Sequence, residues 1–187
     1  MRHRIYEYLY EGRWPMRDSK QIKNKIIAKL FTKYPSLLHR WAQKTQFVEF
    51  EDSPWTRLST DVARSRLALI TTGGVHLTSQ PPFDMKDPDG DPTFREIPKD
   101  TASADLTITH NYYDHTDADK DINIVFPIER VVGLKQAGEI GEVNSRHFSF
   151  MGHILNRHVD TLMTDTAPAI AAALKKDGVD IAILTPA

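Results

Sequence analysis

The sequence predicts an α/β fold with an open, mainly parallel sheet and flanking helices, and three observations carry that prediction. Short apolar runs of the kind found in buried strands recur between residues 67 and 185. Residues with helical spacing separate the later runs. Residues 174–185 combine a helix end, a tight turn at Gly178 and a buried strand. Helices that alternate with parallel strands are typical of Rossmann- and flavodoxin-like domains.

The apolar runs give the expected strands, which are Leu67–Thr72, Asp105–His110, Ile122–Phe126, His147–Phe150 and Val179–Thr185. A helix is expected over residues 159–174, with Asp160 as its N-cap and Gly178 in its C-terminal cap. Gly73 and Gly74 are expected to form a tight exit from the first strand, because no phosphate-binding motif follows them. Residues 78–105 are too long for a plain connection, and long ordered loops often belong to a site.

The chain has 187 residues, 40% of them hydrophobic and 26% charged, which suits one folded domain with an appendage. We expect a helical N-terminal extension over residues 1–50 and the α/β domain over residues 51–187. Five apolar residues of the extension recur at steps of four and three, and Pro35 should divide them between two helices. They are Ile27, Phe31, Tyr34, Leu38 and Trp41.

Charge is unevenly distributed along the chain. Residues 1–66 carry 14 basic and 7 acidic side chains, whereas residues 84–121 carry 4 basic and 11 acidic ones. The lysines of the extension are interpreted as a solvated helix face, with a nucleic-acid surface as the alternative. The net charge of −1 gives no general reason to bind nucleic acid or an acidic membrane.

Other features of the sequence limit where the protein can be located and which chemistry its residues can perform. No uninterrupted apolar run could span a membrane, and no secretory signal opens the chain, so we expect a cytoplasmic protein. The sequence contains no cysteine, which excludes disulfides, thiolate metal sites and a cysteine nucleophile within these residues.

Ligands of open parallel sheets bind beyond the carboxyl ends of the strands. The candidates at those positions are Gly73, Gly74 and His76, the polar segment 110–119, residues 150–153 and Pro186. Segment 110–121 contains two histidines and four aspartates, which could bind a divalent metal or act as a base. Hydrogen bonding to the loop's own backbone, or direct substrate contact, is the alternative. The Asp-Pro-Asp-Gly-Asp run at residues 87–91 predicts a turn, because calcium-loop residues are missing downstream.

Residues 147–152 allow two interpretations. Phe148 and Phe150 alternate as in a buried strand, which favours core packing. Alternatively, His147 leads toward the edge of a pocket for which Phe150 and Met151 supply an apolar wall.

Taken together, several segments between residues 55 and 187 resemble one family. The sequence is similar to the selenoprotein B family of glycine, sarcosine and betaine reductases, which also includes the selenoprotein subunit of D-proline reductase. The segments that carry the resemblance are Ala68–Leu77 with Pro81–Asp84, His110 with Tyr113–Asp114, Asp117–Pro127, Arg146–Gly152, Lys176–Asp180 and Leu184–Pro186.

The resemblance implies reductive cleavage of a carbon–nitrogen bond by a selenocysteine or cysteine that closely follows the Thr185–Pro186 pair. At a strand end that faces a helix N-terminus, such a group has a lowered pKa and is an activated nucleophile. The sequence stops at Ala187, so we expect the α/β domain to be incomplete at its C-terminus. The simplest hypothesis is a UGA selenocysteine codon read as stop; deliberate truncation and chain cleavage are the alternatives.

For this chemistry, carboxylates and imidazoles suit an amine leaving group, and they give candidate residues within the chain. Candidates for proton transfer are His110, Asp114 and His147. Candidates for substrate binding are Gly73, His76, Asp84, Tyr113, Asp119, Phe150, Met151, Gly152, Thr185 and Pro186.

The expected partners are a small amine substrate, a thiol or thioredoxin-like electron donor, other reductase subunits and further copies of the chain, with no nucleic acid and no membrane. We expect no metal and no cofactor apart from the selenocysteine or cysteine. Two other functions stay open. One is a non-catalytic binding or partner subunit, and the other is a metal-dependent hydrolase that uses loop 110–121.

Overall fold

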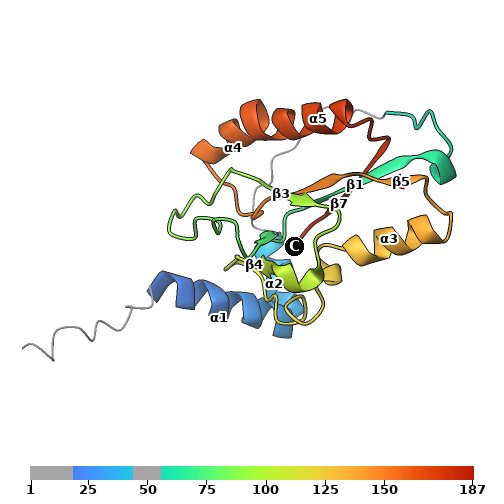
Figure 1. Ribbon diagram of the computed structural model, residues 1–187. Coiled ribbons are helices and arrows are strands. Elements are labelled where there is room, and N and C mark those ends of the chain that lie inside the picture. Colours follow the sequence, from blue (N-terminus) through green and yellow to red (C-terminus); the bar gives the residue numbers. More distant parts are fainter. Residues whose placement is uncertain (1–18, 44–55) are drawn as a thin grey trace, which may run out of the picture.

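The computed structural model describes residues 19–43 and 56–187, and its centre is strand β1 (Arg66–Thr71). On one side β1 pairs in parallel with β7 (Ile181–Thr185) along its length. On the other side it pairs in parallel with β5 (Glu142–Val143) at its start and with β6 (Arg146–Ser149) at its end. Strand β3 (Arg95–Pro98) adds to β6 in antiparallel direction (Figure 1). The predicted α/β fold with a mainly parallel sheet is confirmed.

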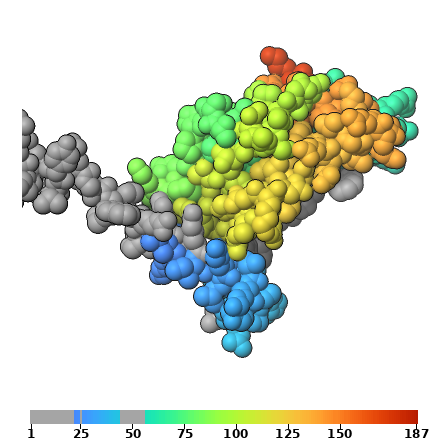
Figure 2. Space-filling model, turned by 60° about the horizontal axis from the view of Figure 1, so that its bottom comes forward, coloured from blue at the N-terminus to red at the C-terminus, as the bar shows by residue number. Residues whose placement is uncertain are grey.

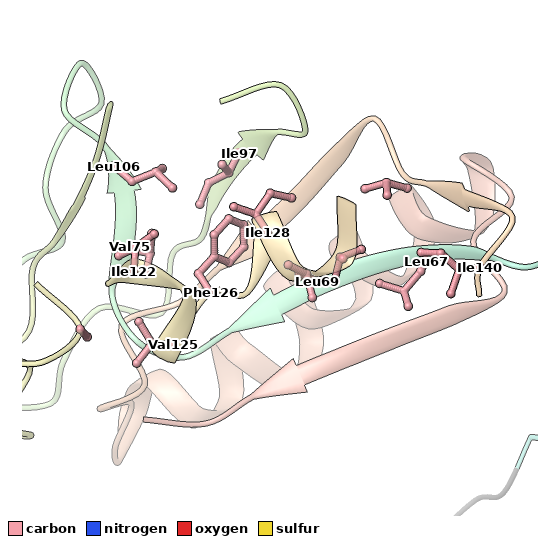
Figure 3. Close-up of a cluster of buried hydrophobic side chains, with 13 residues drawn as sticks. Leu67, Leu69, Val75, Ile97, Leu106, Ile122, Val125, Phe126, Ile128 and Ile140 are labelled. Atoms are coloured by element: carbon pink, nitrogen blue, oxygen red, sulfur yellow. The ribbon is translucent and has the colours of Figure 1, made fainter. Parts of the chain in front are cut away.

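Two cores cover the two faces of this sheet. Side chains alternate along β1, so that Leu67 and Leu69 point to one face and Ala68 to the other. The first face packs against α3 (Ile128–Gln136) and the segment before it, around the fully buried Phe126 (Figure 3). The second face packs against α5 (Ala167–Lys176). The result is a sheet between two helical layers (Figure 1).

A buried histidine completes the sheet between β5 and β6. On this side of β1, the two short strands pair with its two ends and leave its middle without a strand partner. Between them, the backbone N–H of Leu69 donates to Nδ1 of His147 over 3.0 Å. His147 is 0% exposed and lies against Phe126, and burial lowers its pKa to about 4. The neutral imidazole therefore replaces a missing strand carbonyl.

A second, two-stranded sheet follows directly after β1. Strand β2 (Val75–Leu77) pairs in antiparallel direction with β4 (Leu106–Ile108). Here β4 corresponds to the strand expected over residues 105–110, but it lies outside the main sheet. Single turns of 3₁₀ helix precede β1 at Val62–Arg64 and β4 at Ser103–Asp105.

The strand predicted over Ile122–Phe126 is wrong. Residues Ile122–Ile124 form a turn of 3₁₀ helix, and the Asp121 carboxylate accepts the N–H of Asn123. Ile122, Val125 and Phe126 are buried, whereas Ile124 is 59% exposed. Burial at steps of three and one is a helical pattern, and a run of five apolar residues cannot distinguish it from a strand.

The helix predicted over residues 159–174 is interrupted. It consists of α4 (Arg157–Thr161), a π-helical turn (Leu162–Thr166) and α5. Pro168 lacks the N–H that would bond to the carbonyl four residues earlier, which favours such a turn. The N-cap predicted at Asp160 is also wrong, because the helix begins at Arg157 after Asn156. The predicted cap at Gly178 is confirmed, with φ of +71°.

The N-terminal segment forms two helices, α1 (Ser19–Lys33) and α2 (Pro35–Ala42), as Pro35 predicted. The remaining residues of the predicted extension, and its boundary at residue 50, lie outside the described residues. Ala28 is buried with 5% exposure, whereas most large apolar side chains of both helices are exposed. The two helices α1 and α2 form a helical hairpin, which lies beneath the end of the α/β domain that carries β4 (Figure 1).

The buried imidazole of His147 makes a testable contribution to pH dependence. Because its pKa of about 4 in the folded state lies below the ordinary 6.5, the unfolded state binds the proton first as pH falls. His147 therefore stabilises the fold fully above about pH 6.5, and this stabilisation is lost toward pH 4. Between pH 7 and pH 5 the loss from this residue is about 2 kcal/mol.

Urea unfolding followed by circular dichroism checks this expectation. The free energy of unfolding should fall less between pH 7 and pH 5 in His147→Gln than in the wild type. His39→Gln, at an exposed position of α2, should keep the wild-type slope. An unchanged slope in His147→Gln would contradict the assignment.

Candidate functional site at the strand ends

Three parallel strands of the main sheet end in register. Thr71 of β1 lies opposite Ser149 of β6 and Thr185 of β7. The segments that follow stay hydrogen bonded to one another. Thr72 donates its N–H to Thr185 over 3.1 Å, and Gly74 donates to the carbonyl of Phe150 over 2.8 Å. Residues 72–74, 150–152 and 185–187 therefore converge at one edge of the sheet.

The carbonyl of Val125 fixes two of these strand ends. It accepts hydrogen bonds from the hydroxyls of Thr71 and Thr185, each over 2.7 Å. Thr71 Oγ1 also accepts the N–H of Gly73 over 3.0 Å. The exit from β1 is thus held by side-chain hydrogen bonds as well as by the sheet.

Thr72 lies at the centre of the converging segments. Its hydroxyl accepts the N–H of Ala187 over 3.2 Å. Gly152 packs on its other side, where an added Cβ would lie 2.6 Å from the Thr72 carbonyl oxygen. Sequence reasoning did not select Thr72, although its position between a buried strand and Gly73–Gly74 is a usable signal.

Gly74 brings His110 to the same edge. It adopts φ of +70°, as the predicted tight exit requires, and its carbonyl accepts the N–H of Thr109 over 2.9 Å. An added Cβ at Gly74 would lie 3.3 Å from Cβ of His110. The antiparallel return of β4 alongside β2 therefore ends next to the exit from β1.

The His110 ring is 5% exposed and is neutral at physiological pH. Burial, and to a smaller extent the nearby imidazoles of His115 and His153, lower its pKa to about 4, although a hydrogen bond to the Met151 backbone acts in the opposite direction. Nδ1 accepts the N–H of Tyr112 over 3.0 Å, so the proton of the neutral ring lies on Nε2. In this state the Nε2 proton is the one available for the hydrogen bond to the Met151 backbone, and the ring is a weak base.

Tyr113 links His110 to the strand ends. Its hydroxyl donates to the Gly73 carbonyl over 3.0 Å, and its ring centroid lies 4.6 Å from that of His110. Burial raises the pKa of Tyr113, so the phenol keeps its proton at neutral pH.

Beyond Tyr113, a polar cavity of about 210 Å³ lies between segment 113–119 and helix α1. Asp114 accepts the N–H and hydroxyl of Thr116, which lowers the pKa of its carboxyl. His115 contacts Asp119 through Nδ1 over 2.8 Å. The residues that line the cavity are Lys29, Tyr113, Asp114, His115, Thr116 and Asp119.

A larger apolar cavity of about 400 Å³ adjoins the helical hairpin. One wall is formed by the rings of Tyr112 and His153, which stack with centroids 3.6 Å apart. The other wall comes from α1 and α2, through Asn24, Ile27, Ala28, Phe31, Leu38 and Trp41.

Other predicted site residues hold different positions. His76 joins β2 to β4, with Nδ1 on the Leu77 carbonyl and Nε2 on the Thr109 hydroxyl, both over 2.8 Å. Asp84 is exposed in the loop before β3, where it accepts the N–H of Lys86. His147 lies inside the sheet. Their functional roles stay predictions.

The acidic segments show backbone capping. In the Asp-rich run, Asp87 accepts the N–H of Asp89 and Asp91 accepts that of Thr93, which confirms the predicted turn. Within residues 19–43 and 56–187, no group of three or more His, Cys, Asp or Glu side chains is placed to hold a metal ion.

None of the helices described is long and apolar enough to cross a membrane.

Fold and site together define an α/β protein with a candidate small-molecule site at the carboxyl ends of parallel strands. The model of the glycine/sarcosine/betaine reductase selenoprotein B family matches residues 38–187. The chain therefore belongs to the glycine/sarcosine/betaine reductase selenoprotein B family, as the sequence motifs predicted.

Two curated relatives agree with this assignment. D-proline reductase subunit gamma of Acetoanaerobium sticklandii is 34% identical over 131 residues, which are 70% of this chain and 52% of the relative. Glycine reductase complex component B subunit gamma of Carboxydothermus hydrogenoformans is 28% identical over 132 residues, which are 67% of this chain and 28% of the relative. The chain thus spans about half or less of these relatives. No solved structure matches it.

The contact between Gly152 and Thr72 predicts a specific cost of substitution. Gly152→Ala must place a Cβ against the Thr72 carbonyl at φ of +80°, whereas Gly138→Ala has φ of +74° and nothing within 4 Å. Both variants carry the strain of positive φ, about 1–2 kcal/mol, and only Gly152→Ala adds a steric clash. Urea unfolding should show the larger destabilisation for Gly152→Ala. Equal losses in the two variants would contradict the tight contact.

Proposed function

We propose that this chain is part of a reductase subunit that reductively cleaves the carbon–nitrogen bond of a small amine. The reactive group is a selenocysteine or cysteine that follows Ala187 in the full-length subunit. The observation that carries the proposal is the position of residues 185–187, which lead past Thr72 at the edge where three parallel strands end. A chalcogen there would lie at the usual ligand site of a parallel sheet.

The proposed reaction has three balanced steps. The selenolate or thiolate attacks the carbon that bears the nitrogen, and the electron pair of the broken carbon–nitrogen bond leaves with the amine. An external thiolate then attacks the chalcogen, and the released carbon takes the bonding pair and a proton. The mixed selenide–sulfide or disulfide that forms is reduced by a second thiol of the donor.

The residues of the chain contribute binding and hydrogen bonding to this reaction. The carboxylates of Asp114 and Asp119 suit a cationic amine. A protonated amine leaves without taking up a further proton. The reaction therefore does not need a positively charged, acidic His110 ring. The Tyr113 hydroxyl oxygen, which can still accept a hydrogen bond, and the His110 ring beside it are proposed to orient the substrate at the strand ends.

Further features of the proposal concern partners. The relatives are named as subunits of D-proline reductase and of a glycine reductase complex, which supports other reductase subunits as partners. We propose that a thiol or thioredoxin-like donor supplies the electrons, that copies of the chain associate, and that the protein acts in the cytoplasm.

The proposed chemistry is tested by amine release. The full-length subunit, assembled with its partner subunits and a dithiol, should release an amine from at least one of glycine, sarcosine and betaine, or open the ring of D-proline. Replacement of the selenocysteine or cysteine by alanine should abolish this reaction. The native gene should contain a UGA or cysteine codon just after the codon for Ala187. A gene without one, or an assembled wild type that leaves all four compounds intact, would refute the proposal.

His110 provides a separate test of the site. In the same assay His110→Asn should lower turnover by about 10²-fold, because the shorter side chain no longer fills the place of the ring beside Tyr113 and a preorganised site loses its geometry. His39→Asn, on the exposed surface of α2, should leave turnover unchanged. Thermal unfolding of each variant separates loss of the site from loss of the fold. Wild-type turnover in a folded His110→Asn protein would remove this residue from the mechanism.

A further inference from the structure

We infer that Lys29 of helix α1 binds the anionic group of a zwitterionic substrate in the polar cavity beside Tyr113. The inference rests on the proposed function and adds to it a specificity residue from the N-terminal helices. The family model begins at residue 38, so Lys29 lies outside the region that the family match covers.

The cavity is shared between two distant parts of the chain. Five of its lining residues come from segment 113–119, and Lys29 comes from α1. Figure 2 shows the helical hairpin as a lobe against the part of the surface formed by that segment. Without α1, the cavity would have no Lys or Arg side chain in its wall.

Packing of α1 fixes the position of Lys29. The neighbouring Ala28 is the buried residue of the helix. Asn24, Ile27 and Phe31 lie on the same stripe as Ala28, at the spacing of one helix face, and they line the apolar cavity with Tyr112. The face that packs on the loop therefore places Lys29 at the border of the polar cavity.

Some of the charged groups that line the cavity already have hydrogen-bond partners. Asp119 is paired with His115, and one oxygen of Asp114 accepts both hydrogen bonds from Thr116. Lys29 forms no hydrogen bond or ion pair with the described residues, and its electrostatic interaction is with Asp114. One ammonium and one carboxylate oxygen are thus available to a ligand.

A ligand with both charges matches this arrangement. Its ammonium would meet Asp114, and its carboxylate would meet Lys29, in two charge-assisted hydrogen bonds. An anion alone would face two carboxylates, and a cation alone would leave Lys29 unmatched. The cavity of about 210 Å³ equals about seven water volumes of about 30 Å³, so the ligand is small.

Comparison of acids with their amides tests Lys29 directly. Amine release by the assembled full-length subunit is measured with glycine, sarcosine and D-proline and with the amide of each. For at least one pair the wild type should prefer the acid in KM by about tenfold or more, the range of a charge-assisted contact. Lys29→Gln should reduce this preference at least fivefold through the KM of the acid, and Lys29→Arg should restore part of it.

Lys23→Gln is the matched control, because Lys23 is exposed on the same helix and lines neither cavity. It should keep the wild-type preference. Turnover with an unchanged acid-to-amide ratio in Lys29→Gln would overturn the role of Lys29 and leave the proposed function intact.

Absence of turnover in the wild type would instead refute the proposed function. The role of Lys29 is then decided by calorimetric titration of the same acids and amides. Binding of an acid that weakens at least fivefold in Lys29→Gln would support it, whereas equal binding to both proteins, or none to the wild type, would overturn it.

Discussion

The carbonyl oxygen of Val125 accepts hydrogen bonds from the hydroxyls of Thr71 and Thr185 and so fixes where two parallel strands end. Parallel strands that end in register expose a row of backbone groups, and these groups need partners. Here the partners are the other strand exits themselves, since Thr72 bonds to Thr185 and Gly74 bonds to Phe150. The edge of the sheet is therefore held by internal hydrogen bonds before any ligand arrives, and such preorganisation is a requirement for precise positioning of a reactive group.

Two buried imidazoles with similarly lowered pKa values serve different purposes in this frame. His147 is hydrogen bonded to Leu69 within β1 and maintains the sheet. His110 lies beyond the strand ends, beside Tyr113 and near the chain segment that carries Met151. A lowered histidine pKa alone does not identify a functional residue, because burial produces the same shift in both. Position relative to the strand ends distinguishes them.

Sequence reasoning located strands β1, β6 and β7, the division at Pro35, the tight exit at Gly74 and the cap at Gly178, because each depends on local pattern or on backbone conformation. It failed where tertiary contacts decide the local structure. The segment 122–126 is apolar enough for a strand but forms a 3₁₀ turn whose C-terminal carbonyl serves β1 and β7. The π-helical turn before α5 is a different case, because the N–H that Pro168 lacks is a local signal that was visible in the sequence.

The candidate site shows the same division between local and distant information. Its loop was predicted to follow a strand of the main sheet, yet β4 pairs with β2, and His110 reaches the site because that small sheet folds back onto Gly74. Lys29 could not be predicted at all, since its proximity to Asp114 depends on how α1 packs against a loop far along the chain. The acidic excess of residues 84–121 and the basic excess of residues 1–66 were visible, but only the fold shows that Lys29 of α1 lies beside segment 113–119. Under the proposed function, a change in the packing of one helix would alter which ligand binds, while the strand ends that lead to the reactive group would stay the same.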